Sequence, residues 1–223
     1  MGTILVATTK SWNIKAFAEL RGSDPDWHLI TSKEALNSEY LSRLAPDWIF
    51  FPHWSWIVDQ DIYEQWNCVV FHTAPLPKYR GGSVFQHQIM DGHRFSEICA
   101  VKMVGELDAG PIYKRVDIAL DGSMDEIFEW FSLTVYPMME WIIEGDYTLV
   151  PQKGEPTVYR RRTPDMSLLS ENGTRRQIYN FIRALDAPGY PKAFLDYGEF
   201  HMEFDQAELV GERLTARVKI AKR

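Results

Sequence analysis

The chain has 223 residues, of which 45% are hydrophobic, so it can bury a substantial core and does not have the composition of a disordered segment. Its formal net charge of −7 argues against extended binding to nucleic acid, which requires a basic surface. The two cysteines lack the spacing of a zinc site, no apolar run reaches the ~20 residues of a membrane span, and the first residues lack a signal-peptide pattern. We therefore expect a cytoplasmic protein without a metal site or membrane contact.

Short apolar runs alternate with amphipathic segments over the first two-thirds of the chain. Strands are predicted at residues 3–8, 28–31, 48–51, 68–71, 98–104 and 112–119. Helices are predicted between them at residues 12–20, 32–44, 58–66 and 84–90. This alternation predicts an α/β fold in which a Rossmann-like, mostly parallel sheet is flanked by helices.

A long helix follows Ser123, which forms a capping-box pattern with Glu126, and it ends at Gly145. From residue 151 the pattern changes to glycine, proline and arginine. A helix at 175–185 and strands at 193–197, 200–204 and 214–220 then predict a small α+β unit. We therefore expect a catalytic domain at 1–150 and a C-terminal domain at 151–223, which would bind substrate or form a homodimer through a sheet edge.

The turn after the first strand excludes one common use of such a sheet. The sequence Ala7-Thr8-Thr9-Lys10 lacks the glycines that let a backbone approach a pyrophosphate. A phosphate-binding lysine loop is also missing from the sequence, so chemistry that uses NAD or hydrolyses a nucleotide is not expected.

The segment around His72 carries the strongest signal for chemistry. His72 follows an apolar strand, and open α/β sheets bind ligands at the carboxyl ends of their strands. Pro75 and Pro77 stiffen the following loop, and Gly81 and Gly82 allow it to turn closely. This pattern indicates a catalytic histidine beside a rigid loop; the alternative is a core histidine beside an ordinary connection.

A second segment places Asp108 in Leu107-Asp108-Ala109-Gly110, between two predicted strands and 36 residues after His72. If those strands neighbour the strand of His72, the carboxylate can orient the imidazole and raise its basicity. The alternative role for Asp108 is to cap a turn.

Together, these segments resemble the folate-dependent formyltransferase family, which has a histidine, a Leu-Pro loop and an aspartate at this spacing. The resemblance implies N10-formyltetrahydrofolate as the cofactor and an amine as the acceptor. It implies that His72 takes the amine proton or donates to the oxygen that becomes negative, while Asp108 orients His72 and relays a proton. Arg80 to Ser83 and Gln86 resemble the sugar N-formyltransferases of pseudaminic-acid-type pathways. That branch implies a nucleotide-linked amino sugar as substrate and a role in surface polysaccharide biosynthesis.

The chain departs from the family pattern at Val70, where the family has an asparagine two residues before the histidine. Valine has no donor for an oxyanion, and loss of one such donor typically costs about 10²–10³ in rate. His53 is the first candidate to replace it as a third catalytic residue, followed by Ser55 and Ser83.

Two further sets of residues follow from the resemblance. The residues expected to bind the cofactor are Trp54, Ser55, Trp56, Leu76, Val104 and Gly105. The residues expected to bind the substrate are Lys78, Arg80, Gly82, Ser83, Gln86, Arg160, Arg161, Arg162, Arg183 and Tyr190. Three adjacent arginines can bind a diphosphate through paired guanidinium contacts, or they can form a solvated charge run. The two tryptophans can cover a heterocycle or pack in the core.

Several alternatives to an amino sugar transferase remain. Water could replace the amine, as in a formyltetrahydrofolate hydrolase, or the acceptor could be another small amine or a carrier-bound amino acid. Val70 also fits a catalytically impaired module that binds folate or sugar. The acidic charge and the length argue against methionyl-tRNA as acceptor.

Overall fold

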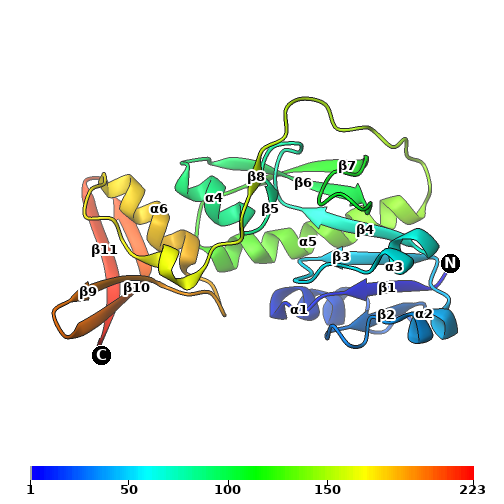
Figure 1. Ribbon diagram of the computed structural model, residues 1–223, viewed down its shortest axis with the longest axis horizontal. Helices are drawn as coiled ribbons and strands as arrows, with labels where there is room; N and C mark the ends of the chain where they lie inside the picture. The colour runs from blue at the N-terminus through cyan, green and yellow to red at the C-terminus, as the bar shows by residue number, and fades with distance from the viewer. Residues whose placement is uncertain (1) are drawn as a thin grey trace. The chain divides into compact units, whose positions relative to one another are not determined.

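The computed structural model describes residues 2–223 and contains a six-stranded sheet with the order β2-β1-β3-β4-β6-β7 (Figure 1). Its strands are β1 (Ile4–Ala7), β2 (Trp27–Ile30), β3 (Trp48–Pro52), β4 (Asn67–His72), β6 (Phe95–Lys102) and β7 (Ile112–Ala119). The pairs β1–β2, β1–β3 and β3–β4 are parallel, whereas β4 and β6 are antiparallel. The mostly parallel sheet predicted from the sequence is confirmed.

The helices are α1 (Ser11–Leu20), α2 (Ser38–Leu44), α3 (Gln60–Gln65), α4 (Val84–Met90), α5 (Met124–Ile143) and α6 (Arg175–Leu185). The chain forms two compact units. Unit 1 contains residues 2–80, Glu97–Ile118 and Glu129–Val158, and unit 2 contains Gly81–Ser96, Ala119–Phe128 and Tyr159–Arg223. Among residues 2–223, no helix combines the length and the apolar character needed to cross a membrane.

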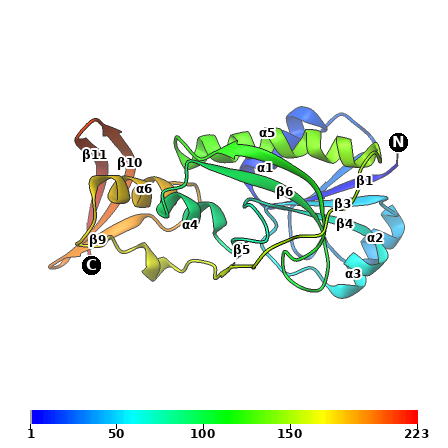
Figure 2. The ribbon, with the colours of Figure 1, turned by 90° about the horizontal axis from the view of Figure 1, so that it is seen from above.

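Helices cover both faces of the sheet in unit 1. Figure 2 shows α1 and α5 on one face and α2 and α3 on the other. The side chains of Leu5 and Ala7, two residues apart on β1, pack with Leu41 of α2 and Ile62 of α3. A strand buried on both faces needs apolar residues at every position, which is why β1 reads Ile-Leu-Val-Ala without polar interruption.

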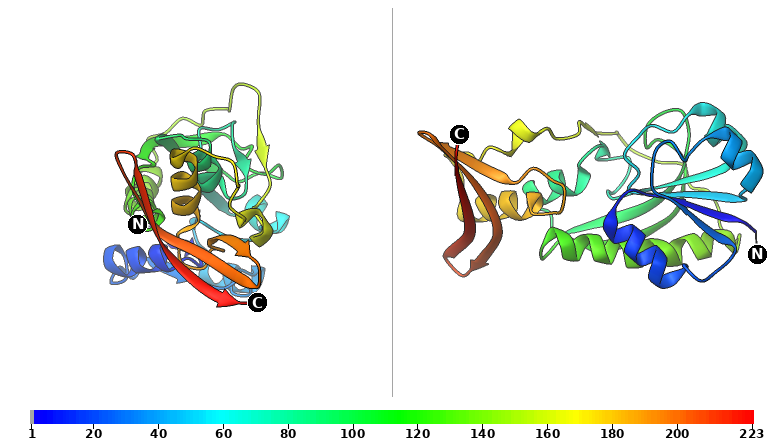
Figure 3. Two further views of the ribbon diagram at one scale, coloured as in Figure 1. Left: turned by 90° about the vertical axis from the view of Figure 1, so that its left-hand side faces the viewer. Right: turned by 90° about the horizontal axis from the view of Figure 1, so that it is seen from below.

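Unit 2 contains an antiparallel sheet with the order β11-β10-β9, formed by β9 (Ala193–Tyr197), β10 (Phe200–Val210) and β11 (Arg213–Lys222). Helix α6 lies against this sheet (Figure 3). The hydrophobic core of unit 2 contains Leu169, Ile182, Leu185 and Ala193. The predicted C-terminal α+β unit is therefore present in this part of the chain.

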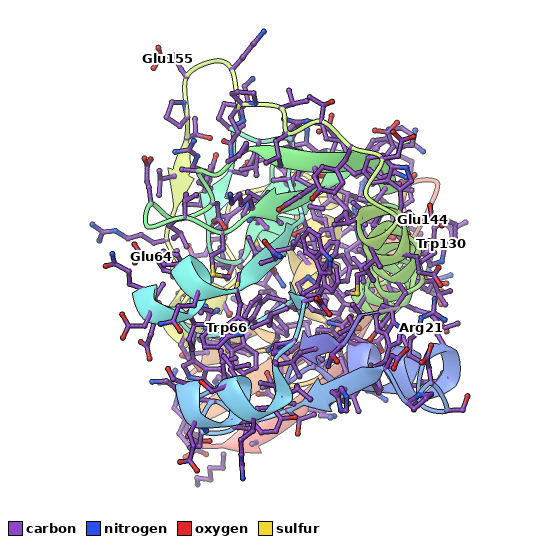
Figure 4. All side chains as sticks on the ribbon, turned by 90° about the vertical axis from the view of Figure 1, so that its right-hand side faces the viewer. Arg21, Glu64, Trp66, Trp130, Glu144 and Glu155 are labelled. Carbon is purple, nitrogen blue, oxygen red and sulfur yellow. The ribbon has the colours of Figure 1, made fainter. Side chains whose placement is uncertain are left out.

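One local prediction was wrong, and one short strand pair was not predicted. Residues 32–37 are not helical, because the Asn37 side chain accepts a hydrogen bond from the Tyr40 backbone N–H at 2.9 Å and starts α2 at Ser38. The sequence also gave no sign of the short pair β5 (Arg80–Gly81) and β8 (Val158–Tyr159). The loop from α5 to β8 has Glu155 at its outer tip (Figure 4).

Candidate active site

His72 is the last residue of β4 and is only 5% exposed. Its Nε2 lies 2.7 Å from the backbone carbonyl oxygen of Tyr79. A carbonyl oxygen can only accept, so Nε2 carries a hydrogen and donates to it. The loop after β4 therefore fixes the tautomer and the orientation of the ring.

Asp108 lies on the opposite side of the His72 ring. Its Oδ2 is 3.4 Å from His72 Nδ1, and the two side chains are 7% and 6% exposed. Because Nε2 already carries a hydrogen, Nδ1 of a neutral ring would turn a lone pair toward the carboxylate. That contact becomes favourable when one further proton lies on either Nδ1 or Asp108. The geometry therefore favours a pair that shares one proton away from water.

The topology explains why residues 36 positions apart meet. Strand β6 pairs with β4 so that Cys99 is the register partner of His72, and the loop between β6 and β7 carries Asp108. Gly110 crosses the backbone there so closely that a Cβ would lie 1.8 Å from the Lys102 carbonyl oxygen. Only glycine fits at this position, which explains why a glycine stands two residues after Asp108.

His53 follows β3 in a left-handed backbone conformation, with φ of 55°. Its Nδ1 accepts a hydrogen bond from Trp12 Nε1 at 3.1 Å, and its ring stacks on Phe131 with centroids 3.9 Å apart. Burial, together with the nearby charges of Lys10 and His72, lowers the pKa of His53 to about 3. The ring is therefore neutral near pH 7 with its hydrogen on Nε2, which makes Nε2 a hydrogen-bond donor.

Sequence reasoning missed Asn13, which holds the end of β3 just before His53. The Asn13 amide donates to the Pro52 carbonyl oxygen at 3.1 Å, and its Oδ1 accepts from Ser132 Oγ of α5 at 2.8 Å. A buried asparagine inside a predicted helix was the available signal, because such a residue needs polar partners.

The residues expected to bind the cofactor differ in their surroundings. Trp54 and Trp56 meet edge to face, with centroids 5.0 Å apart. Trp56 is 41% exposed, while the buried Nε1 of Trp54 has no hydrogen-bond partner among residues 2–223. Leu76 packs in a core cluster with Cys99, Val101 and Ile112. Ser55 and Val104 are partly buried, and Gly105 is exposed.

Arg80 was expected to bind substrate, but its side chain contacts other groups of unit 1. Nη1 donates to Glu106 Oε1 at 2.7 Å, while Nε and Nη2 donate to Gln152 Oε1 at 3.3 and 2.9 Å. Arg80 is only 9% exposed, so these contacts account for most of its donors. Lys78, two residues earlier, is exposed.

In unit 2 the arginine run 160–162 packs against Gly82, which was expected to bind substrate. A Cβ on Gly82 would lie 2.8 Å from the Cβ of Arg161, and Ser83 Oγ accepts from the Arg162 backbone N–H at 3.1 Å. His87 Nε2 donates to the Arg160 carbonyl oxygen at 3.2 Å. These contacts bring Gly82, Ser83 and the arginines together, as a common binding surface requires.

Gln86 of α4 is 2% exposed, and its Nε2 has no hydrogen-bond partner among the described residues 2–223. Its side chain is hydrogen-bonded to Tyr190; burial raises the pKa of Tyr190, and this hydrogen bond and the charge of Arg161 oppose the rise. Arg183 is different, because its Nη1 donates to the carbonyl oxygens of Leu120 and Gly122 at 2.6 and 3.0 Å. Arg183 therefore stabilises the loop 120–122.

The C-terminal part of the chain, residues 164–221, matches the family model described as methionyl-tRNA formyltransferase, C-terminal domain. A methionyl-tRNA formyltransferase of Sulfurihydrogenibium sp. (strain YO3AOP1) is 25% identical over 187 residues, which are 80% of this chain and 60% of that protein. The Francisella philomiragia enzyme is 28% identical over 178 residues, or 77% and 54% of the two chains. The chain thus spans less than two thirds of the length of these curated relatives.

Solved structures show the same fold. The methionyl-tRNA formyltransferase from Clostridium thermocellum aligns over 100% of both chains, with 38% identity and a TM-score of 0.94. HypX from Aquifex aeolicus, solved in complex with tetrahydrofolic acid, has a TM-score of 0.76 and 18% identity over 92% of this chain and 38% of that chain. A 4-N formyltransferase from Francisella tularensis has a TM-score of 0.67 and 14% identity over 86% and 91% of the two chains.

Proposed function

Because the chain belongs to the folate-dependent formyltransferase family, we propose that it transfers the formyl group of N10-formyltetrahydrofolate to the nitrogen of an amine. The cofactor supplies an electrophilic formyl carbon. The protein must then stabilise the charge that develops on the formyl oxygen and move protons between nitrogens. The observation that carries the proposal is the buried contact of 3.4 Å between His72 Nδ1 and Asp108 Oδ2, within electrostatic range of the neutral His53.

The environment of Trp54 fits a bound pterin. Trp54 and Trp56 offer flat apolar surface, and Trp54 Nε1 is a buried donor that lacks a partner among residues 2–223. A buried N–H without an acceptor is unfavourable, and a heterocycle with ring nitrogens and a carbonyl group would provide one. We propose that Ser55, Leu76, Val104 and Gly105 line the same surface.

His53 is proposed to replace the asparagine that is absent at Val70. Its Nε2–H would donate to the formyl oxygen as that oxygen becomes negative. Since the ring is already neutral and held by Trp12, it needs no change of protonation to act. This preorganisation is what makes a hydrogen-bond donor effective in catalysis.

The His72–Asp108 pair is proposed to move the proton. His72 Nε2 donates to the Tyr79 carbonyl oxygen, so the mobile proton is the one shared by Nδ1 and Asp108. Asp108 can give that proton to the departing nitrogen and recover one from the attacking amine, so that protons balance over the reaction. This division differs from the expectation that His72 itself contacts the amine or the oxygen.

For the acceptor we propose a nucleotide-linked amino sugar, whose phosphoryl groups would contact residues of unit 2. Gln86 Nε2, Arg161 and Tyr190 offer hydrogen-bond donors suited to a phosphoryl group. The net charge of −7 disfavours a polyanion as large as a tRNA. Methionyl-tRNA is the second candidate, because the methionyl-tRNA formyltransferase from Clostridium thermocellum aligns over the full length. We also propose a homodimer.

An activity panel tests this function. The full chain is incubated with N10-formyltetrahydrofolate and UDP-, dTDP- or GDP-linked amino sugars, with methionyl-tRNA as a separate acceptor. Mass spectrometry of the acceptor detects the added formyl group. We expect one class of amino sugar to react and the His72→Asn variant to lose about 10²–10⁴-fold in turnover. Formylation of methionyl-tRNA alone would overturn the acceptor, and no reaction with any of these acceptors would overturn the transferase proposal.

A further inference from the structure

Gln152 contacts both sides of the loop that carries Asp108. Its Nε2 donates to the carbonyl oxygen of Asp108 at 2.7 Å and to that of Gly110 at 2.9 Å. Its Oε1 accepts from Arg80, through Nη2 at 2.9 Å and Nε at 3.3 Å. Both donors and the acceptor of one amide are thus used to join the Asp108 loop to Arg80.

The loop needs such support because of its backbone conformation. Asp108 has φ of 53°, in the left-handed region, which residues with a side chain adopt at an energetic cost that is smaller for aspartate than for most. A carboxylate on this backbone keeps its direction only while the surrounding structure holds the loop. The carbonyl groups of Asp108 and Gly110, on either side of Ala109, both accept from Gln152, so one side chain holds the loop at both positions.

The other end of this contact leads back to His72. The Arg80 backbone N–H donates to the Thr157 carbonyl oxygen at 2.8 Å, and the Tyr79 backbone N–H donates to Thr157 Oγ1 at 2.8 Å. The Tyr79 carbonyl oxygen in turn accepts from His72 Nε2. Residues 150–157 therefore contact both the loop that orients His72 and the loop that orients Asp108.

Backbone pairing at Val150 fixes the position of the chain just before Gln152. Val150 and Ile112 exchange backbone hydrogen bonds of 2.9 and 3.0 Å, which places Gln152 two residues beyond a fixed point. Glu106 forms an ion pair with Arg80 and so holds the start of the Asp108 loop. Gln152 is thus held through its side chain by Arg80 and through the nearby backbone by the Val150–Ile112 pair, as accurate positioning requires.

We propose that Gln152, held by Arg80, is a positioning residue that keeps Asp108 in contact with His72. The proposal deepens the formyl transfer proposed above and rests on it for its kinetic consequence. Gln152 does not touch the reacting atoms; it acts through the direction of the Asp108 carboxylate. A purely structural role would lower stability without changing the His72–Asp108 contact.

The test compares Gln152→Glu with Lys153→Ala, an exposed neighbour, in the full chain. Glutamate keeps the shape and can accept from Arg80, but it cannot donate to the two carbonyl groups. We expect kcat to fall about 10–100-fold, as for lost outer-shell support of a catalytic group, with KM for the formyl donor within about two-fold. Lys153→Ala should match the natural protein.

A second readout does not depend on activity. The ¹⁵N resonance of His72 Nδ1 should move in Gln152→Glu toward its position in Asp108→Asn, and it should not move in Lys153→Ala. An unchanged resonance together with unchanged kcat would overturn the proposal. A shifted resonance in a chain without transferase activity would instead overturn the proposed function and leave the positioning role standing. If Gln152→Glu does not fold, Gln152→Met is measured in its place.

Discussion

The indole Nε1–H of Trp12 donates to Nδ1 of His53 at 3.1 Å, and this contact determines which nitrogen of the neutral His53 ring carries the hydrogen. Without it the two tautomers would compete, and one of them would present a lone pair where the proposed role of His53 requires a donor. The contact links a residue of α1 to a loop after β3, so the donor is prepared by the fold itself.

Replacing Trp12 with phenylalanine tests this preparation. The variant keeps an aromatic ring but loses the N–H, so part of the His53 population should shift to the other tautomer. For His53→Ala we expect kcat to fall about 10²-fold. For Trp12→Phe the fall should be smaller, because the His53 ring can still donate part of the time. Steady-state kinetics measure both variants. Trp130→Phe, at a 60% exposed position of α5, is the matched control and should leave kcat unchanged.

The low pKa of His53 predicts how stability changes with pH. Its pKa is about 3 in the folded chain and about 6.5 in the unfolded chain, so the unfolded state binds more protons between these values. The folded state should therefore lose stability through this group as pH falls below about 6.5. Between pH 6.5 and 5 the loss should be about 2 kcal/mol.

Urea unfolding of the natural chain and of His53→Phe at both pH values measures this contribution. Phenylalanine can keep the stacking on Phe131 and does not titrate. The free energy of unfolding of His53→Phe should therefore fall less over this interval. Equal losses in the two chains would show that folding does not lower the pKa of His53.

Val70 offers a way to exchange the proposed oxyanion donor. Val70 and His72 are two residues apart on β4, so their side chains share a face of the sheet. In a His53→Ala background, Val70→Asn should recover at least ten-fold of the lost kcat, because the amide supplies an N–H where the family has one. Val70→Leu in the same background is the control without a donor. Equal activity of the two double variants would argue against a missing donor as the cause.

Gln86 and Gln88 of α4 provide a test residue and a matched control for the proposed acceptor site. Both are buried, at 2% and 1% exposed, but Gln88 donates to the Val84 carbonyl oxygen at 3.1 Å and accepts from Ser96 Oγ at 2.6 Å. Gln88→Leu should therefore destabilise the chain by about 1–3 kcal/mol. Gln86→Leu should cost less stability, because it removes the hydrogen bond to Tyr190, whereas Gln88→Leu removes two hydrogen bonds.

The functional effects of this pair should be opposite to the effects on stability. Gln86→Leu should raise KM for the nucleotide-linked amino sugar about ten-fold while KM for the formyl donor stays the same. Gln88→Leu should leave both KM values unchanged at a temperature where it is folded. A Gln86→Leu variant with normal KM for the acceptor would remove Gln86 from the acceptor site.

The sequence allowed the sheet and most helices to be predicted because their signals are local. Apolar strands such as residues 68–71 and capping patterns such as Ser123 with Glu126 lie within a few positions. The meeting of His72 with Asp108 was anticipated from a family spacing. Physically it depends on the antiparallel pairing of β6 with β4, which no local pattern specifies.

The residues that sequence reasoning missed act through contacts between distant segments. Gln152 lies 44 positions from Asp108, and Asn13 lies 119 positions from Ser132. Arg80 was expected to face substrate because it lies on the catalytic loop, whereas its partners Glu106 and Gln152 come from two other segments. Composition and spacing carry no information about such pairings.

The loop around Glu155 has a practical use that follows from its contacts. Residues 153–156 are exposed, while Gln152 before them and Thr157 after them make hydrogen bonds to the Asp108 carbonyl oxygen and the Tyr79 backbone N–H. A fluorophore attached at a cysteine introduced in place of Glu155 would therefore sit a few residues from both anchors without replacing either. The native thiols Cys68 and Cys99 are buried, which favours selective labelling at the new position. The chain thus provides its own attachment point for an optical sensor of ligand binding.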